Sequence, residues 1–314
     1  MKPLNKIVTA MFYTAVFLFF VIKDGLAQKR SYTYRTANDT TQNLYYSLVP
    51  ANKPEGLLMI LPGFGTMPEE MILETKLPEK AVAKNYLVII PVLDKWDTFY
   101  MDNLCMNRMD TLLAELYAKH DIAGKKFILG GHSIGGTGAV LYAERCFQLN
   151  KKLKPDMVFG VDPPLDMKRM WKTFIRNQKI NFSEVSVGEA KFMQEYFTRK
   201  FGGSPEKFPA VYRKWSPYFH EDEKGGNAKY LTKIPVRFYC DPDINWGIEN
   251  RRANSESMNL FDLTGMIVQL KLQGNTKAEL VTALGKGYFA DGRRHPHAFS
   301  ILDADEFLEW VQKN

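Results

Sequence analysis

The residues best suited to chemistry in this 314-residue sequence surround Ser133. The stretch Gly131-His132-Ser133-Ile134-Gly135 fits the pattern G-x-S-x-G, with a strand-like run before it (Lys126–Gly131) and a helix-like run after it. A serine on such a tight turn adopts strained backbone angles, and glycines two positions away on either side avoid steric clashes. The turn lifts the hydroxyl above the sheet edge, and the N-terminus of the next helix faces a developing oxyanion. Ser133 is therefore the candidate nucleophile.

Two other Gly-rich loops fit this stretch less well. A phosphate-binding loop needs a Gly-Lys-Ser/Thr ending, which is missing, and a dinucleotide-binding loop needs an acidic residue after a further strand about 20 residues on, where "FQLNKKLKPD" stands instead. The three cysteines and five histidines show no metal-ligand spacing. We therefore expect neither a cofactor nor a metal.

The motif, its flanking strand and helix, and the further Gly136 and Gly138 resemble the α/β-hydrolase superfamily. The resemblance covers nearly all of Gln28–Asn314. In that family the catalytic residues follow the chain order Ser, then acid, then His. The resemblance implies a Ser-His-Asp triad and an acyl-enzyme intermediate.

The family order restricts the choice of base. His132 is the variable residue of the motif, His120 ends a helix that leads into a strand, and His220 precedes the region of the acid. The loop "DGRRHPHAFSILD" between the last strand and the last helix keeps His295 and His297. We prefer His297 as the base, because His295 follows two arginines; His295 is then an exposed loop residue or a substrate contact.

The acid is expected after the strand in "IPVRFYCDPDINW", where Asp241 and Asp243 compete. The family's acid lies a few residues into the loop, so we choose Asp243 and interpret Asp241 as a turn residue. Asp162, in "GVDPP" after the preceding strand, is a less favoured alternative. Whichever is correct should be buried against Nδ1 of the histidine, to hold its tautomer and to stabilise the imidazolium.

Two backbone amides are expected to form the oxyanion hole. One belongs to Ile134, directly after the nucleophile, and the other to the loop "ILPGFGTMPEE" after an apolar strand. Family members often have His-Gly before the donor residue, and here Pro62 replaces that histidine. We choose the amide of Phe64 as the second donor.

The predicted elements can place these residues at one edge of a sheet. Eight runs indicate strands, and the middle ones are continuously apolar, as strands covered on both faces should be; they are Ser31–Thr36, Asn43–Val49, Gly56–Pro62, Leu87–Leu93, Lys126–Gly131, Asp156–Asp162, Pro235–Asp241 and Ala278–Leu284. Helical patterns separate several of them, and "DADEFLEWVQK" predicts a final helix with Asp303 at its start. The pattern indicates the α/β class, with a mostly parallel sheet of about eight strands flanked by helices.

One region interrupts this alternation. Pro163–Thr232 has no clear strand, 13 aromatic residues, and 13 Lys and Arg against 8 Asp and Glu. A helical insertion at the C-terminal edge of the parallel strands is placed to cap the site. We expect some of its aromatic side chains to line a pocket and others to attach the cap to the core. The basic and aromatic composition of this insertion suggests that the substrate carries a sizeable anionic or aromatic acyl or alcohol group, for example on a glycan.

The N-terminus has the pattern of a secretory signal peptide over residues 1–27. Positive residues precede the uncharged run Ile7–Ile22, and Gly25 and Ala27 suit a cut before Gln28. The run is shorter than a typical membrane span, so a cleaved signal peptide is favoured over the alternative, an uncleaved membrane anchor. We expect a secreted or periplasmic domain over 28–314, with no stable membrane anchor after cleavage. In that compartment Cys105 and Cys146 could form a disulfide.

The charge argues against a nucleic-acid partner. The chain carries +7 formally, which is mild for this length, and no nucleic-acid-binding motif accompanies it. The function predicted from the sequence is an exported serine hydrolase that cleaves a carboxylic ester of a small molecule or of a glycan. The alternatives are a serine peptidase or amidase, and a non-catalytic binding protein on the same scaffold.

Overall fold

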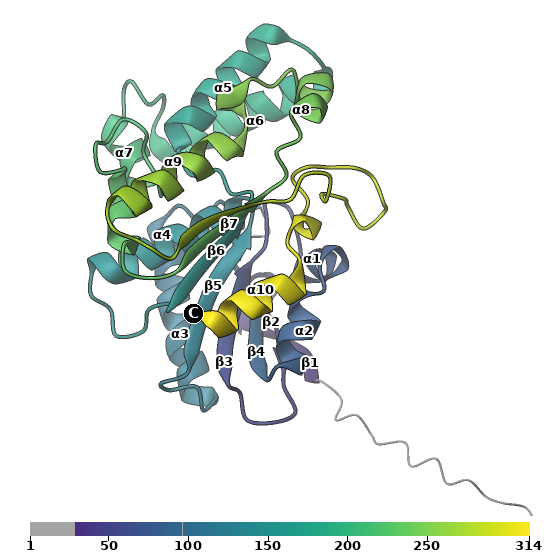
Figure 1. The fold of residues 1–314 in the computed structure, drawn as a ribbon, viewed down its shortest axis with the longest axis vertical. Coiled ribbons are helices and arrows are strands. Elements are labelled where there is room, and N and C mark those ends of the chain that lie inside the picture. The colour runs from purple at the N-terminus through teal and green to yellow at the C-terminus, as the bar shows by residue number, and fades with distance from the viewer. Residues whose placement is uncertain (1–28, 96) are drawn as a thin grey trace, which may run out of the picture.

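The fold is built on one mostly parallel sheet, shown in Figure 1 by a computed structural model that describes residues 29–95 and 97–314. Its order is β1-β2-β4-β3-β5-β6-β7-β8. The strands are β1 (Lys29–Thr36), β2 (Asp39–Val49), β3 (Gly56–Leu61), β4 (Tyr86–Lys95), β5 (Lys126–His132), β6 (Met157–Val161), β7 (Val236–Cys240) and β8 (Ala278–Thr282). The pairs β1–β2 and β2–β4 are antiparallel, and the others are parallel. The predicted fold class is confirmed.

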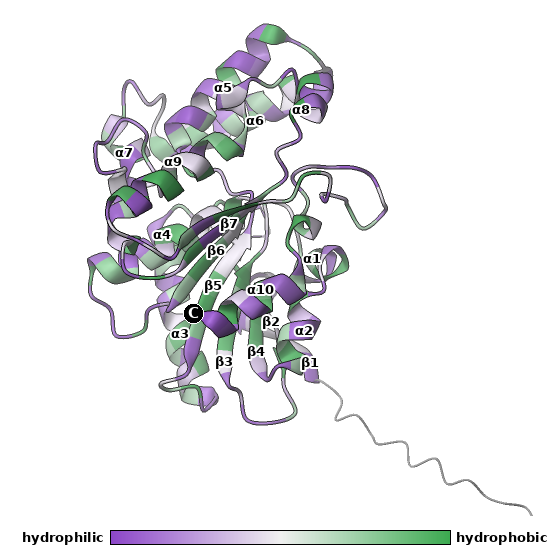
Figure 2. Cartoon of the chain, in the orientation of Figure 1, coloured by the Kyte–Doolittle hydropathy of each residue, from purple (hydrophilic) through white to green (hydrophobic). Residues whose placement is uncertain are grey.

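Helices cover both faces of the sheet. The bounds are α1 (Pro68–Glu74), α2 (Leu77–Ala83), α3 (Asn103–Lys119), α4 (Ile134–Gln148), α5 (Met167–Ile180), α6 (Glu184–Phe201), α7 (Pro209–Lys214), α8 (Ile244–Arg251), α9 (Asn259–Leu272) and α10 (Ala304–Lys313), with short 3-10 turns η1 (Gly226–Leu231), η2 (Ser255–Ser257) and η3 (Phe299–Ile301). Side chains of α1, α2 and α10 pack on one face, and those of α3, α4 and α9 on the other. The inner strands are mostly hydrophobic, as Figure 2 shows, because both their faces are covered.

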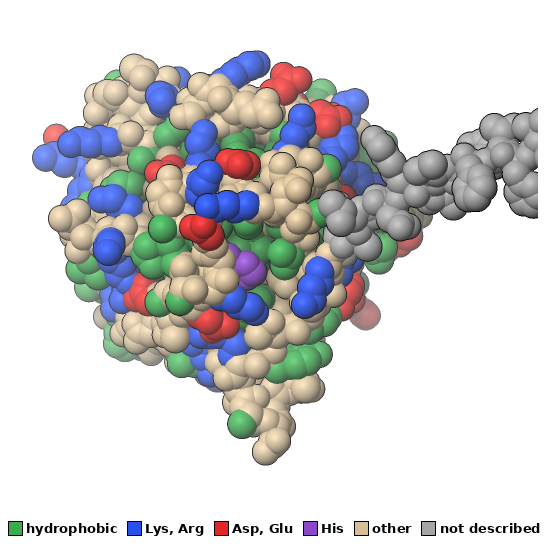
Figure 3. Space-filling view, turned by 90° about the horizontal axis from the view of Figure 1, so that it is seen from below, with side chains coloured by type: hydrophobic (Ala, Val, Ile, Leu, Met, Phe, Trp, Pro, Cys, Tyr) green, Lys and Arg blue, Asp and Glu red, His purple; other side chains and the backbone are tan. Residues whose placement is uncertain are grey.

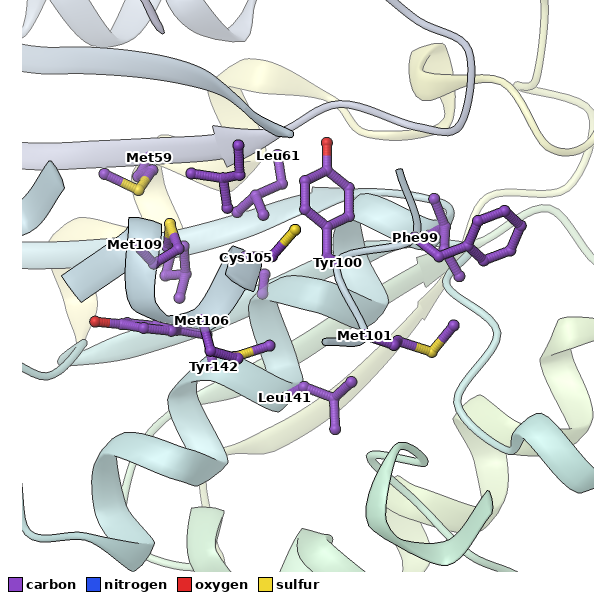
Figure 4. Close-up of a cluster of buried hydrophobic side chains, with 14 of the residues drawn as sticks. Met59, Leu61, Phe99, Tyr100, Met101, Cys105, Met106, Met109, Leu141 and Tyr142 are labelled. Carbon is purple, nitrogen blue, oxygen red and sulfur yellow. The ribbon is translucent and has the colours of Figure 1, made fainter. Parts of the chain in front are cut away.

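The core beside α3 and α4 is rich in methionine and holds Tyr100 (Figure 4). The buried hydroxyl of Tyr100 donates to the carbonyl of Pro62 at 3.0 Å, so this side chain ties the core to the loop after β3. Cys105 is buried in the same cluster. All three cysteines are free, so the structure does not contain the disulfide considered for Cys105 and Cys146.

The segment between β6 and β7 forms a helical cap. Helices α5, α6 and α7 follow β6, and Figure 1 shows α5 and α6 above the end of the sheet where the parallel strands finish. Helix α8, which follows β7, lies beside them. The helices above this end of the sheet therefore come from two connections, β6 to β7 and β7 to β8. Helices α1, α8 and α9 are not among the elements predicted from sequence.

The face of the molecule that Figure 3 shows carries charges of both signs. Figure 3, which looks from below relative to Figure 1, shows Lys and Arg interspersed with Asp and Glu. Among the described residues, no helix has the length and apolar character needed to cross a membrane. The predicted signal peptide lies outside these residues.

Candidate active site

Ser133 stands on a strained turn between β5 and α4. Its φ of 51° and ψ of −126° are unusual for a residue with a side chain, and its amide donates to the carbonyl of Val161 on the neighbouring strand at 2.9 Å. α4 begins at the next residue. The turn therefore has the local geometry predicted from the motif.

The two motif glycines are steric requirements of this turn. A Cβ added to Gly131 would lie 2.5 Å from the carbonyl oxygen of Leu61, and one added to Gly135 would lie 2.2 Å from the same oxygen. These are backbone contacts that no side-chain rotation can relieve. The end of β3 thus packs directly against the serine turn.

His297 connects the serine to an acid. The Ser133 hydroxyl donates to Nε2 of His297 at 2.7 Å, and Nδ1–H of His297 donates to Oδ2 of Asp162 at 2.5 Å. Asp162 follows β6 directly, and its side chain is only 14% exposed. The structure brings the predicted nucleophile and base together, with Asp162 as the third member.

The choice of Asp243 as the acid is corrected by this geometry. Asp243 caps the start of α8, where Oδ1 accepts from the amide of Trp246 and Oδ2 pairs with Arg294 at 2.8 Å. Asp241 is buried and accepts from the amides of Gly285 and Gly287. Both carboxylates hold neighbouring chain in place, and neither hydrogen-bonds His297. Because β6 lies between β5 and β7, its end is one strand closer to Ser133.

The pKa of His297 is raised above its ordinary value of 6.5. Burial acts to lower it, but the hydrogen bond and the negative charge of Asp162 together outweigh burial. His297 is therefore a stronger base than a free imidazole. The pKa of His295 instead falls to about 4, because of burial and the nearby charge of His297, so His295 stays neutral at pH 7.

His132 positions the loop that carries the base, a role that the sequence does not indicate. Its Nε2–H donates to the carbonyl of His297 at 2.6 Å, and its ring stacks on Phe299. Burial, followed by the charge of His297, lowers the pKa of His132 to about 3. A permanently neutral histidine can make this contact without repelling the base.

The two predicted oxyanion donors flank the serine. Ile134 is the first residue of α4, and the first amides of a helix have no acceptor within it. Phe64 and Ile134 line the same cavity as Ser133, and a Cβ added to Gly63 would lie 3.6 Å from Cβ of Ser133. Among the described residues, no hydrogen bond uses the amide of Phe64. Both amides are therefore free to bind an oxyanion.

A cavity of about 310 Å³ lies over the serine, between the sheet edge and the cap. From the cap come Met170, Phe174 and Met193, and from outside it Phe99 and Trp246. Its two arginines are paired, Arg169 with Asp262 and Arg251 with Glu189. The cavity is therefore mainly apolar and has no unpaired arginine.

Five aromatic residues of the cap, Trp171, Phe174, Phe197, Phe201 and Tyr212, pack with one another. Phe197 contacts Phe174, Phe201 and Tyr212 at ring-centroid distances of 5.5, 5.0 and 6.2 Å. Of the 13 aromatics in residues 163–232, only Phe174 lines the cavity. The aromatic composition therefore reflects the interior of the cap more than the site.

The sheet order, the cap after β6 and the serine turn after β5 define the α/β-hydrolase fold, and this chain has it. No protein-family model matches the sequence. No curated protein sequence matches it either.

Solved structures share the fold at low sequence identity. An S-formylglutathione hydrolase from Agrobacterium tumefaciens is 12% identical at a TM-score of 0.54, over 92% of this chain and 96% of its own. Carboxyl esterase 2 from Tuber melanosporum is 15% identical at a TM-score of 0.55, over 84% and 79%. An acylaminoacyl peptidase from Pyrococcus horikoshii is 12% identical at 0.56, over 91% of this chain and 41% of that one.

Proposed function

We propose that this protein is an exported serine hydrolase that cleaves carboxylic esters. The observation that carries the proposal is the continuous hydrogen-bonded series from Ser133 through His297 to Asp162, beside two free backbone amides. A carboxyl esterase, a putative esterase and a lipase among the solved structures of the same fold support ester hydrolysis. Export rests on the signal-peptide pattern of residues 1–27.

The proposed mechanism uses all three members of the series. His297 Nε2 takes the proton of Ser133 as Oγ attacks the ester carbonyl, and Asp162 stabilises the imidazolium that forms. The amides of Phe64 and Ile134 bind the oxyanion of the tetrahedral intermediate. His297 then gives its proton to the leaving alcohol, and water hydrolyses the acyl-enzyme by the same steps.

A fluorophosphonate probe tests the nucleophile. We expect the full-length protein, expressed with its leader, to be labelled at Ser133 in the periplasmic or extracellular fraction, and Ser133→Ala to remain unlabelled. A folded Ser133→Ala protein that still takes the label, or a folded parent protein that takes none, contradicts the proposed chemistry. Label found only in the cytoplasm contradicts export.

The cavity supports an apolar group of moderate size on the substrate. Its lining includes three Phe and three Met side chains, and its arginines are neutralised by Glu189 and Asp262. Each buried methylene contributes about 0.8 kcal/mol, so an acyl chain that fills this space is favoured over acetyl. An anionic substrate group, suggested by the basic composition of the insertion, finds no unpaired arginine here.

A series of nitrophenyl esters measures this preference. We expect kcat/KM to rise by up to about 15-fold with each pair of added methylenes from acetyl to a medium-length acyl chain. Met193→Trp, which fills the cavity from α6, should abolish this rise and leave acetyl hydrolysis nearly unchanged. Val185→Trp, on the same helix but 73% exposed and outside the cavity, is the matched control. A parent enzyme that prefers acetyl contradicts the assignment.

A further inference from the structure

Asn259, the first residue of α9, contacts the acid of the series. Its Nδ2 donates to the backbone carbonyl of Asp162 at 2.9 Å and to Oδ2 of the Asp162 carboxylate at 3.3 Å. Oδ2 is the oxygen that accepts from Nδ1 of His297. Asn259 thus reaches both the main chain and the side chain of Asp162 from an element 97 residues away.

The orientation of the Asn259 amide is fixed by a donor on its other side. Oδ1 accepts from Nη2 of Arg169 at 3.0 Å. A guanidinium has no acceptor, so only the oxygen of the amide can face Arg169. The NH₂ group must then face Asp162, which needs a donor.

Arg169 is itself held in place by a buried carboxylate. Its Nε donates to Oδ1 of Asp262 at 3.0 Å, and Asp262 has no exposed surface. Asp262 also accepts from the amides of Leu165 and Asp166, where the cap begins, and from His220 at 3.0 Å. Burial acts to raise the pKa of Asp262, but Arg169 and His220 lower it to about 2, so it stays ionised.

From this arrangement we infer that Asn259 is a positioning residue for the reaction, holding Asp162 in the orientation that His297 requires. Arg169 and Asp262 fix the amide, the amide fixes the acid, and the acid fixes the imidazole. The inference rests on the proposed hydrolase function.

The chemistry explains why an amide suits this position. A carboxylate left with His297 as its only partner can rotate about χ2, and the imidazole would follow it away from Ser133. An amide donor restrains that rotation without adding charge. A cation here would instead offset the negative charge of Asp162, which stabilises the imidazolium of His297. The same network joins the first residues of the cap to the triad, so cap and acid are held as one unit.

Three variants test the inference. In Asn259→Ala the donor is lost, and we expect kcat to fall by about 10- to 100-fold, more than KM changes, as expected for misplaced reacting groups. Asn259→Asp keeps the shape and the acceptor for Arg169 but turns an acceptor toward Asp162. Its kcat should also fall, and the added charge should move the acid limb of kcat/KM to higher pH. Thr264→Ala, exposed on the same helix, is the matched control.

The shift of the acid limb reports on position 259 because the other charged or titratable groups near the triad are unchanged in these variants. Those groups are His132, His295, Glu74, Glu189, Arg251 and Arg169. Asn259→Asp also serves if Asn259→Ala does not fold, because it retains the contact with Arg169.

The NMR resonance of the Nδ1 proton of His297 provides a readout that does not depend on turnover. The resonance should be present at low field in the parent, absent from His297→Gln, and shifted upfield or broadened in Asn259→Ala. A parent that resists the fluorophosphonate probe overturns the hydrolase function. A labelled parent whose Asn259 variants keep the parent's kcat, acid limb and resonance overturns the role of Asn259 alone.

Discussion

Asp162→Asn should lower kcat by about 10⁴-fold while the protein remains folded. Asparagine keeps the shape of the side chain, but it offers an NH₂ group or a neutral oxygen where His297 Nδ1–H needs a carboxylate. The imidazole then loses the partner that selects its tautomer, and the imidazolium loses its counter-charge. Steady-state kinetics on a nitrophenyl ester measure the loss, and thermal unfolding verifies the fold.

The pH profile gives the same substitution a second signature. Only the neutral form of His297 can accept the proton of Ser133, so kcat/KM must fall as the pH drops below the pKa of His297. That pKa lies above 6.5 because Asp162 outweighs the effect of burial. We therefore expect the acid limb of the parent above pH 6.5, and the residual activity of Asp162→Asn should show the limb at lower pH.

Asp243→Asn is the control that separates the two carboxylates. Asparagine can still accept from the amide of Trp246 at the start of α8, and the pair lost with Arg294 is partly exposed. We expect kcat within a few-fold of the parent. A large loss in Asp243→Asn, with near-normal activity in Asp162→Asn, would show that the acid lies after β7 and that the observed hydrogen bond to Asp162 is not used.

The position of the acid shows how far the sequence determines this site. The apolar and β-branched runs predicted all eight strands, and the glycines around Ser133 predicted its turn. Two adjacent strands, however, are each followed directly by an aspartate, and their sequences do not say which end lies nearer the serine. That depends on strand order and on α8, whose first turn is capped by the carboxylate of Asp243. Neither follows from local pattern.

Residues that act across the fold were missed for the same reason. Asn259 and Arg169 lie 90 positions apart, and nothing in either segment indicates that they meet beside Asp162. The role of His132 also depends on a loop 165 positions away. Composition predicted an aromatic cap, but which side chains face the cavity depends on how α5 and α6 pack, and there Met170 and Met193 line it with Phe174.

Gly135→Ala should destabilise the fold and disable the site together. The new Cβ would lie 2.2 Å from the carbonyl oxygen of Leu61 and 2.3 Å from that of Pro62. Both are backbone atoms, so β3 and the loop that carries Phe64 must move away from Ser133. We expect the free energy of unfolding to fall by about 3 kcal/mol, and kcat/KM by at least about 100-fold.

Gly188→Ala separates this steric effect from the general effect of replacing a glycine. Gly188 lies within α6, and a Cβ there would meet nothing within 4 Å. Alanine favours a helix by about 0.5–1 kcal/mol over glycine, so this variant should be as stable as the parent or more so. Thermal unfolding and ester kinetics on both variants make the comparison. If Gly135→Ala matched Gly188→Ala in both measurements, the turn would have room for a side chain and the close packing of β3 against Ser133 would be wrong.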